Sequence, residues 1–156
     1  MKNKLVLIIF TLIFGNLLAF AQTRNEGIFR YVDLGEGRKI SLGQEFTKIE
    51  NLFIKTEIGF RLKPDTFGVA KDINIFLANN KIKAIFFDYF SNEKTFEQKV
   101  ASYTKSLGKP KSNKNFDSNS IKVNVVYWED NRTRFELIKK TEREKVSLSS
   151  AMFDKE

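Results

Sequence analysis

The stretch Ile73–Phe90 constrains the fold most strongly, because two alternating runs flank a dipeptide that suits a tight turn. Asn79-Asn80 tolerates the positive φ angles of a type I′ turn, which predicts a β-hairpin with Ala78 opposite Lys81. In this register one face of the hairpin is wholly apolar, and a slip of one residue destroys that agreement. The predicted core face holds Ile73, Ile75, Leu77, Ile82, Ala84 and Phe86.

The opposite face of the predicted hairpin is mixed, with aromatic and basic side chains. Such side chains dominate binding hot spots, so this face is a candidate recognition surface. The alternative is a second packing layer, since aromatic side chains usually become buried. The candidate binding residues are Phe76, Lys83, Ile85, Phe87 and Tyr89.

A helix is predicted directly after the hairpin. Thr95 and Gln98 form a capping box, which satisfies backbone amides in the first turn. Gly108 supplies a left-handed C-terminal residue, and Pro110 prevents continuation. The helix has one apolar stripe, formed by Phe96, Val100, Tyr103 and Leu107.

A second, shorter helix is predicted near Lys48–Ile54, because Thr47 and Glu50 form another capping box. Each predicted helix precedes consecutive candidate strands. This order favours an α+β fold, an antiparallel sheet with two helices packed on one face. It also suggests two helix–strand–strand units.

The remaining chain predicts strands at Ile28–Leu34, Thr56–Leu62 and Val146–Ser150, with a mobile polar loop over Lys109–Ser120. A second hairpin joins residues 121–128 to 133–139, and its register stays open. One alternative pairs Trp128 with Thr133 and Val126 with Phe135. The other pairs Tyr127 with Phe135 and Val125 with Leu137, which gives the cleaner apolar face.

Residues 1–21 have the three parts of a cleaved secretory signal. These are a basic start at Lys2 and Lys4, an apolar run over Leu5–Leu18 and a small-residue cleavage site that ends at Ala21. The apolar run is short for a bilayer span, which makes an uncleaved anchor the weaker alternative. Cleavage leaves residues 22–156 as one domain without a transmembrane segment, in the periplasm or secreted.

The chain contains neither cysteine nor histidine, and its formal charge is +8 at pH 7. The missing residue types exclude the usual zinc sites and Cys or His nucleophiles, and no calcium-loop spacing of acids is present. We therefore expect no metal or cofactor. The positive charge suits an anionic partner such as envelope lipid or glycan, although A/T-rich codons for Lys, Asn, Ile and Phe are the favoured explanation. Export disfavours nucleic acid as a partner.

Four further features are candidate sites. Asp88 continues the predicted core face, where a buried carboxylate could act as a general acid, although exposure at the strand end is the simpler interpretation. Trp128 is interpreted as a core residue with its ring N–H bonded to backbone, in preference to a binding anchor at the loop tip beside Glu129–Arg132. A Ser–Lys nucleophile is disfavoured, because adjacency along a strand is not the geometry of a dyad. The serines considered for this nucleophile are Ser147, Ser149 and Ser150, near Lys145. The cluster Lys105–Lys114 is interpreted as a solvated loop.

Three short motifs carry a resemblance to known exported proteins: Ile40-Ser41-Leu42-Gly43, Leu107-Gly108-Lys109-Pro110 and Tyr127-Trp128. They resemble the SmpA/OmlA (BamE) family and folds like the β-lactamase inhibitor protein. Members of both groups are non-enzymatic and bind other proteins. The chain lacks the lipid-attachment cysteine of the SmpA/OmlA pattern, and the resemblance transfers no functional residue.

These observations together predict an exported, non-enzymatic protein that binds a protein or a cell-envelope component. An inhibitor, an immunity protein and an assembly accessory all fit this description. The alternatives are a small exported hydrolase that uses carboxylates, with Asp88 as its acid, and a binder of anionic lipid or glycan.

Overall fold

The fold is that of a computed structural model, which describes residues 27–64, 72–89 and 93–156. Within these ranges the chain forms ten β-strands, one α-helix and two short 3₁₀ helices. The strands are β1 Tyr31–Gly35, β2 Arg38–Ser41, β3 Phe53–Thr56, β4 Gly59–Leu62, β5 Asp72–Ala78, β6 Lys81–Tyr89, β7 Ser112–Ser118, β8 Ile121–Glu129, β9 Thr133–Glu142 and β10 Lys145–Asp154. The helices are α2 Glu93–Leu107 and the 3₁₀ helices η2 Phe46–Lys48 and η3 Glu50–Leu52.

The predicted α+β class with two helices on a sheet is wrong, and so are the two helix–strand–strand units. The described chain is mostly β, with α2 as its single α-helix. The second expected helix is replaced by η2, η3 and the strand β3. Pairing of β3 with β4, which sets Phe53 opposite Leu62, outweighs the local capping-box signal.

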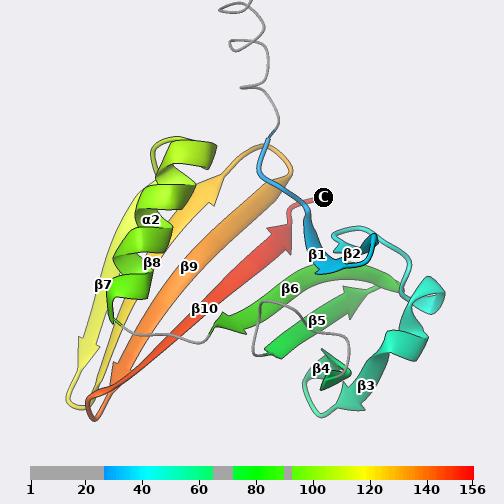
Figure 1. The fold of residues 1–156 in the computed structure, drawn as a ribbon, viewed down its shortest axis with the longest axis horizontal. Helices are drawn as coiled ribbons and strands as arrows, with labels where there is room; N and C mark the ends of the chain where they lie inside the picture. The colour runs from blue at the N-terminus through cyan, green and yellow to red at the C-terminus, as the bar shows by residue number, and fades with distance from the viewer. Residues whose placement is uncertain (1–26, 65–71, 90–92) are drawn as a thin grey trace, which may run out of the picture.

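Eight of the strands form one antiparallel sheet in the order β3-β4-β5-β6-β10-β9-β8-β7, and β1 and β2 form a separate hairpin. Consecutive strands are neighbours except at β6, which pairs with β10. The last strand therefore lies in the middle of the sheet and joins the two hairpin groups. Figure 1 shows the two groups splayed at a large angle, with α2 across β8 and β9.

One face of the sheet is covered by every described element outside it. Tyr103 of α2 contacts the rings of Trp128 and Phe135, with centroids 5.8 and 4.7 Å apart. Phe46 of η2 lies on Phe60 of β4 with centroids 4.3 Å apart. The β1–β2 hairpin contributes to the same hydrophobic core. We call this side the covered face, and the other side the open face.

The first predicted hairpin is confirmed at its turn and corrected in its register. Asn79 and Asn80 both have positive φ angles, and Ala78 pairs with Lys81 as expected. A β-bulge at Lys83 then shifts the ladder by one residue. Ile75 consequently pairs with Ile85 rather than with Ala84, and the two faces of β6 exchange their side chains beyond the bulge.

The second hairpin takes neither of the two predicted registers, because Trp128 pairs with Phe135. The turn is built around Asp130, whose Oδ1 accepts the backbone N–H groups of Arg132 and Thr133 at 2.8 and 2.7 Å. This Asx-type turn fixes the loop length and hence the register. It places Trp128 and Phe135 together on the covered face.

The C-terminal end of α2 lies where the sequence predicts it, whereas the N-terminal end does not. α2 ends at Leu107, and Gly108 has a φ of 85°, as the sequence predicts. It begins at Glu93, before the expected cap at Thr95. The loop expected after Gly108 is largely the strand β7.

Candidate binding surface

An aromatic row crosses the open face where β5, β6 and β10 meet. Phe76 and Phe86 meet edge to face with centroids 5.9 Å apart, and Phe86 meets Phe153 in the same way at 5.7 Å. Phe76 is 45% exposed, whereas Phe86 and Phe153 are half-buried. The side chains between these rings, Ala84 and Ala151, are small and buried, so they do not project from the open face. We call Phe76, Phe86 and Phe153 the aromatic row.

A polar group borders the aromatic row on β8 and β9. The Arg134 guanidinium lies over the Tyr127 ring, 4.3 Å from its centroid, and pairs with Glu136 at 2.5 Å. Beyond this group the open face becomes aliphatic and ends at Phe116 on β7, which is 57% exposed. The aliphatic side chains are Ile121, Val123, Val125 and Ile138, all half-buried.

The open face carries charges of both signs, and most of them are paired within the chain. Besides Arg134–Glu136, the pairs are Arg61–Asp72 at 3.4 Å and Lys140–Glu142 at 2.7 Å. An apolar centre bordered by paired charges has the composition of a protein–protein interface.

Of the five residues predicted for binding, Phe76 alone lies on the open face. Ile85 and Phe87 are buried in the core, 0% and 8% exposed, because the bulge turns them to the covered face. Lys83 also faces the covered side, where its Nζ donates to Asp154 Oδ2 at 2.9 Å. These residues do not form one surface.

Tyr89, the fifth predicted residue, lies in a polar cluster between the sheet and α2. Its hydroxyl contacts Tyr103 Oη at 3.2 Å and accepts a hydrogen bond from Ser150 Oγ at 3.1 Å. Lys99 lies over the Tyr89 ring at 3.8 Å. Burial raises the pKa of the Tyr89 hydroxyl above its usual range and lowers the pKa of Lys99. Ser150 is 0% exposed, and its hydrogen bond to Tyr89 satisfies its buried hydroxyl within this cluster.

Asp88 is exposed on the open face, directly opposite Asp72 in the β5–β6 pair. The sequence did not indicate this second carboxylate, because the bulge that aligns the two was unforeseen. Asp72 already pairs with Arg61. Because Asp88 is exposed, the pair is not enclosed as a buried general acid would be.

Trp128 is a core residue, as predicted. It is 1% exposed, and its Nε1–H donates to the Gly108 carbonyl at 2.9 Å. This bond ties the C-terminal end of α2 to the sheet.

A cleft of about 570 Å³ lies beside this end of α2 and is lined by part of the predicted lysine cluster. Glu129 and Asp130 also line it, but both are engaged within the chain. Glu129 pairs with Lys155 at 2.5 Å, and Asp130 accepts the Ile28 N–H at 2.6 Å. The cleft lysines are Lys105, Lys109 and Lys111.

Neither a metal-binding cluster nor a membrane-spanning helix is present in the described residues. Residues 27–64, 72–89 and 93–156 contain no group of three or more acidic residues placed to hold a metal ion. None of the helices in those ranges has the length and apolar content needed to cross a bilayer.

Comparisons with protein-family models, curated proteins and solved structures found no match. The resemblance to the SmpA/OmlA (BamE) family therefore stays a prediction.

The aromatic row and its polar neighbours were largely missed by sequence reasoning. Phe86 was assigned to the core, and Phe153 to no face at all. The sequence of β6 contains the signal, since both faces of that strand are apolar from Ala84 to Phe87. It does not say which face is covered.

Proposed function

We propose that this chain is an exported, non-enzymatic binding protein whose open face docks a folded protein of the cell envelope or the extracellular space. The observation that supports this most is the aromatic row, which lies on a sheet face that no described element covers. Aromatic side chains concentrated at the centre of a patch are the common anchors of protein interfaces.

The charge distribution favours a protein partner over an anionic polymer or lipid surface. Three cations on the open face are matched by nearby acids, in the Arg61–Asp72, Arg134–Glu136 and Lys140–Glu142 pairs. A surface that binds polyanions instead presents unpaired cations, and its affinity collapses as salt rises. We expect binding at the open face to change little between low and physiological salt.

The proposal is tested by a matched pair of charge substitutions. Phe76→Glu puts a carboxylate into the exposed end of the aromatic row, and Ile58→Glu makes the same change at a 71% exposed residue between β3 and β4, outside that row. A partner captured from envelope and supernatant fractions is identified, purified and titrated against both variants. We expect Phe76→Glu to weaken affinity at least tenfold, about 1.4 kcal/mol, and Ile58→Glu to leave it unchanged. Equal affinity of the two variants would contradict the proposal.

Export is the part of the proposal that rests on residues 1–21, which lie outside the described residues. The N-terminus of the protein isolated from its native cells tests it. We expect a chain that begins at Gln22 in the periplasm or medium; an intact Met1 on the cytoplasmic protein would refute export.

A further inference from the structure

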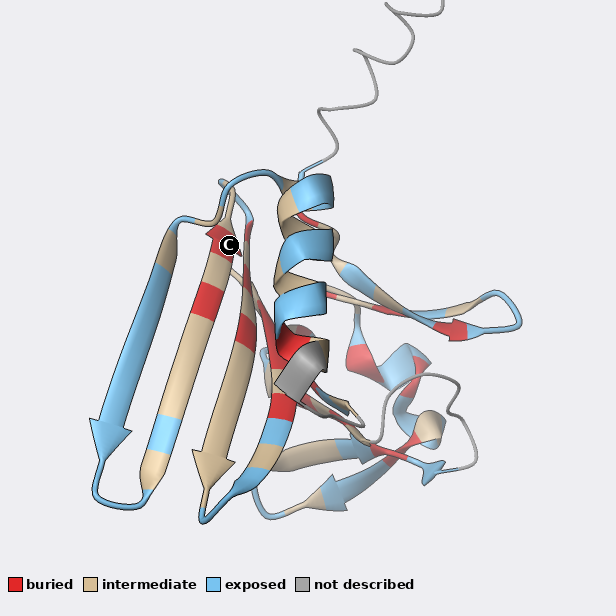
Figure 2. Cartoon of the chain, turned by 60° about the vertical axis from the view of Figure 1, so that its left-hand side comes forward, coloured by how far each residue is buried: buried red, intermediate tan, exposed pale blue. Residues whose placement is uncertain are grey.

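The strand β7 is a free edge of the eight-stranded sheet. It is last in the strand order, and six of its seven residues are exposed. The other edge strand, β3, has four residues. Figure 2 shows β7 exposed along its length at the margin of the sheet. Within β7 there is no proline and no bulge in its pairing with β8, so its outer backbone groups are regularly spaced for another strand.

We propose that β7 pairs with β7 of a second copy of this chain, antiparallel and about a two-fold axis at Asn115. Asn115 is the midpoint of Ser112–Ser118, so this register alone overlaps the two strands along their full length. It gives the isologous contact that closed dimers use. The proposal concerns the edge of the sheet and stands apart from partner docking on the open face.

The side chains of β7 are complementary to themselves in this register. Lys114 lies opposite Phe116 of the second copy on the open-face side, and Asn113 lies opposite its Asp117 on the other side. No charge faces a like charge across the axis. Moving the axis one residue back places Lys114 opposite itself, which is destabilising, and also shortens the overlap.

The side chain of Asn115, which lies at the proposed axis, can donate a hydrogen bond across the contact. Asn115 Oδ1 accepts a hydrogen bond from Asn124 Nδ2 at 2.5 Å, which leaves the Asn115 amide group to donate towards the second copy. Asn124, Asn115 and their counterparts would form one ladder of amides across the junction. Residues that face each other across such an axis lie on the same side of both sheets, so the two open faces form one continuous surface.

Single-cysteine variants test the register, because the chain has no cysteine of its own. In an antiparallel pair the two copies of residue 115 have Cα atoms about 5 Å apart, within disulfide reach. The two copies of residue 113, and likewise of 117, lie about 14 Å apart, beyond it. We expect Asn115→Cys to form a disulfide-linked dimer at least tenfold faster than Asn113→Cys or Asp117→Cys. Equal rates, or faster linkage at 113 or 117, would overturn the proposal.

Sedimentation velocity supplies an independent readout with a matched control. Asn115→Lys sets two lysines against each other at the axis, whereas Asn113→Lys sets each new lysine opposite Asp117 of the second copy. We expect a dimer for the wild type and for Asn113→Lys and a monomer for Asn115→Lys, with all three folded by circular dichroism. A monomeric wild type at tens of micromolar, or the same association state for both lysine variants, would refute the dimer.

Discussion

At the residue scale, Asp154 holds together segments from three parts of the chain. Its carboxylate is 3% exposed and pairs with Arg30 at 2.6 Å and Lys83 at 2.9 Å. Arg30 also donates to the Arg132 carbonyl and to Thr133 Oγ1. Asp154 therefore fixes the segment before β1 and the bulge in β6 against the end of β10.

The protonation of Asp154 is linked to folding. Burial alone would raise the pKa of this carboxyl, but hydrogen bonds from Lys83 and Arg30 outweigh burial and hold the pKa below its ordinary value of 3.8. A carboxyl with a lowered folded-state pKa stabilises the fold above its unfolded-state pKa. That stabilisation is lost as the pH falls below 3.8 and through the folded-state value.

We expect Asp154→Asn to lower the free energy of unfolding by about 3 kcal/mol at pH 7, because it leaves two cations without their shared carboxylate. The deficit relative to the wild type should shrink below pH 4, where the wild type also loses the charge. Urea titrations at several pH values measure both effects. Glu142→Gln, in an exposed pair with Lys140, should cost less than about 1 kcal/mol. A deficit for Asp154→Asn that is constant from pH 7 to pH 3 would exclude the ion pairs as its cause.

Single residues were predicted well where one local rule decided them, and poorly where a distant contact did. Trp128 is large and has one donor to satisfy, so its burial followed from its type. The residue type of Lys83 does not predict its position in the same way. Its place in the bulge depends on Asp154, 71 positions away, and that single extra residue reversed which side of β6 enters the core.

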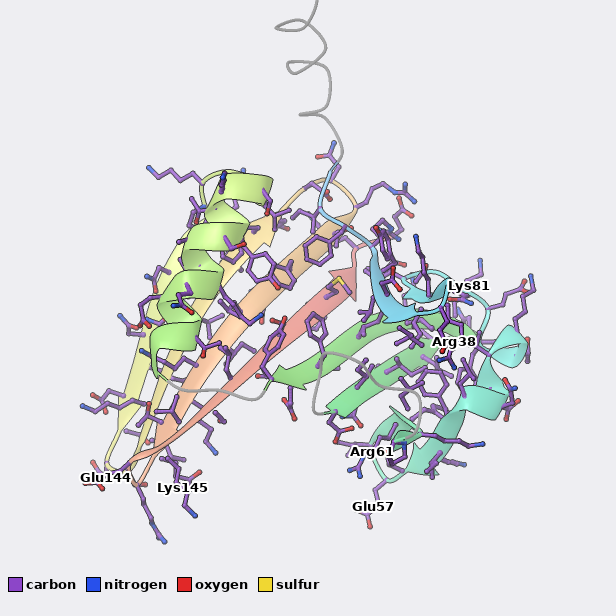
Figure 3. The ribbon with its side chains drawn as sticks, viewed as in Figure 1. Arg38, Glu57, Arg61, Lys81, Glu144 and Lys145 are labelled. Atoms are coloured by element: carbon purple, nitrogen blue, oxygen red, sulfur yellow. The ribbon has the colours of Figure 1, made fainter. Side chains whose placement is uncertain are left out.

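At the element scale, two tight turns have similar backbones and different sequences. Asn79-Asn80 and Arg143-Glu144 both have two successive positive φ angles. Asn adopts this conformation easily, whereas Arg and Glu are strained in it. Glu144 lies at the tip of the β9–β10 hairpin, far from Lys81 (Figure 3).

Replacing Arg143-Glu144 with Asn-Gly should therefore stabilise the protein by about 1 kcal/mol. The change removes strain at a hairpin tip and leaves the core untouched. Replacing Asn80 with Gly is the control and should gain less, since Asn already tolerates the angle. Chemical denaturation compares the two; a gain at Asn80 equal to that at the 143–144 turn would argue against strain as the cause.

Elements were predictable from sequence where periodicity and end signals agreed. The Asn79-Asn80 turn, the apolar stripe of α2 and its end at Gly108 all followed from local chemistry. β7 did not, because an edge strand exposed on nearly every residue needs no apolar alternation. Its pairing with β8 supplies the order that its own polar sequence does not indicate.

At the scale of the whole molecule, β10 decides which surface stays free. By pairing with both β6 and β9 it joins two hairpin groups into one sheet, and all the covering elements lie on one side. The aromatic row forms only because this pairing brings Phe153 beside Phe86. No local pattern in the sequence contains that contact, which is why the candidate surface could not be assigned before the fold was known.

The most direct test of the open face as a docking surface is site-specific photo-cross-linking in the native cells. A photoreactive phenylalanine analogue replaces Phe76 in one variant and Ile58 in the other, so both probes start from exposed positions. We predict that the probe at position 76 captures one discrete protein on illumination and that the probe at 58 does not. Identical products from both positions, or no product from 76 with the protein folded and exported, would contradict this account.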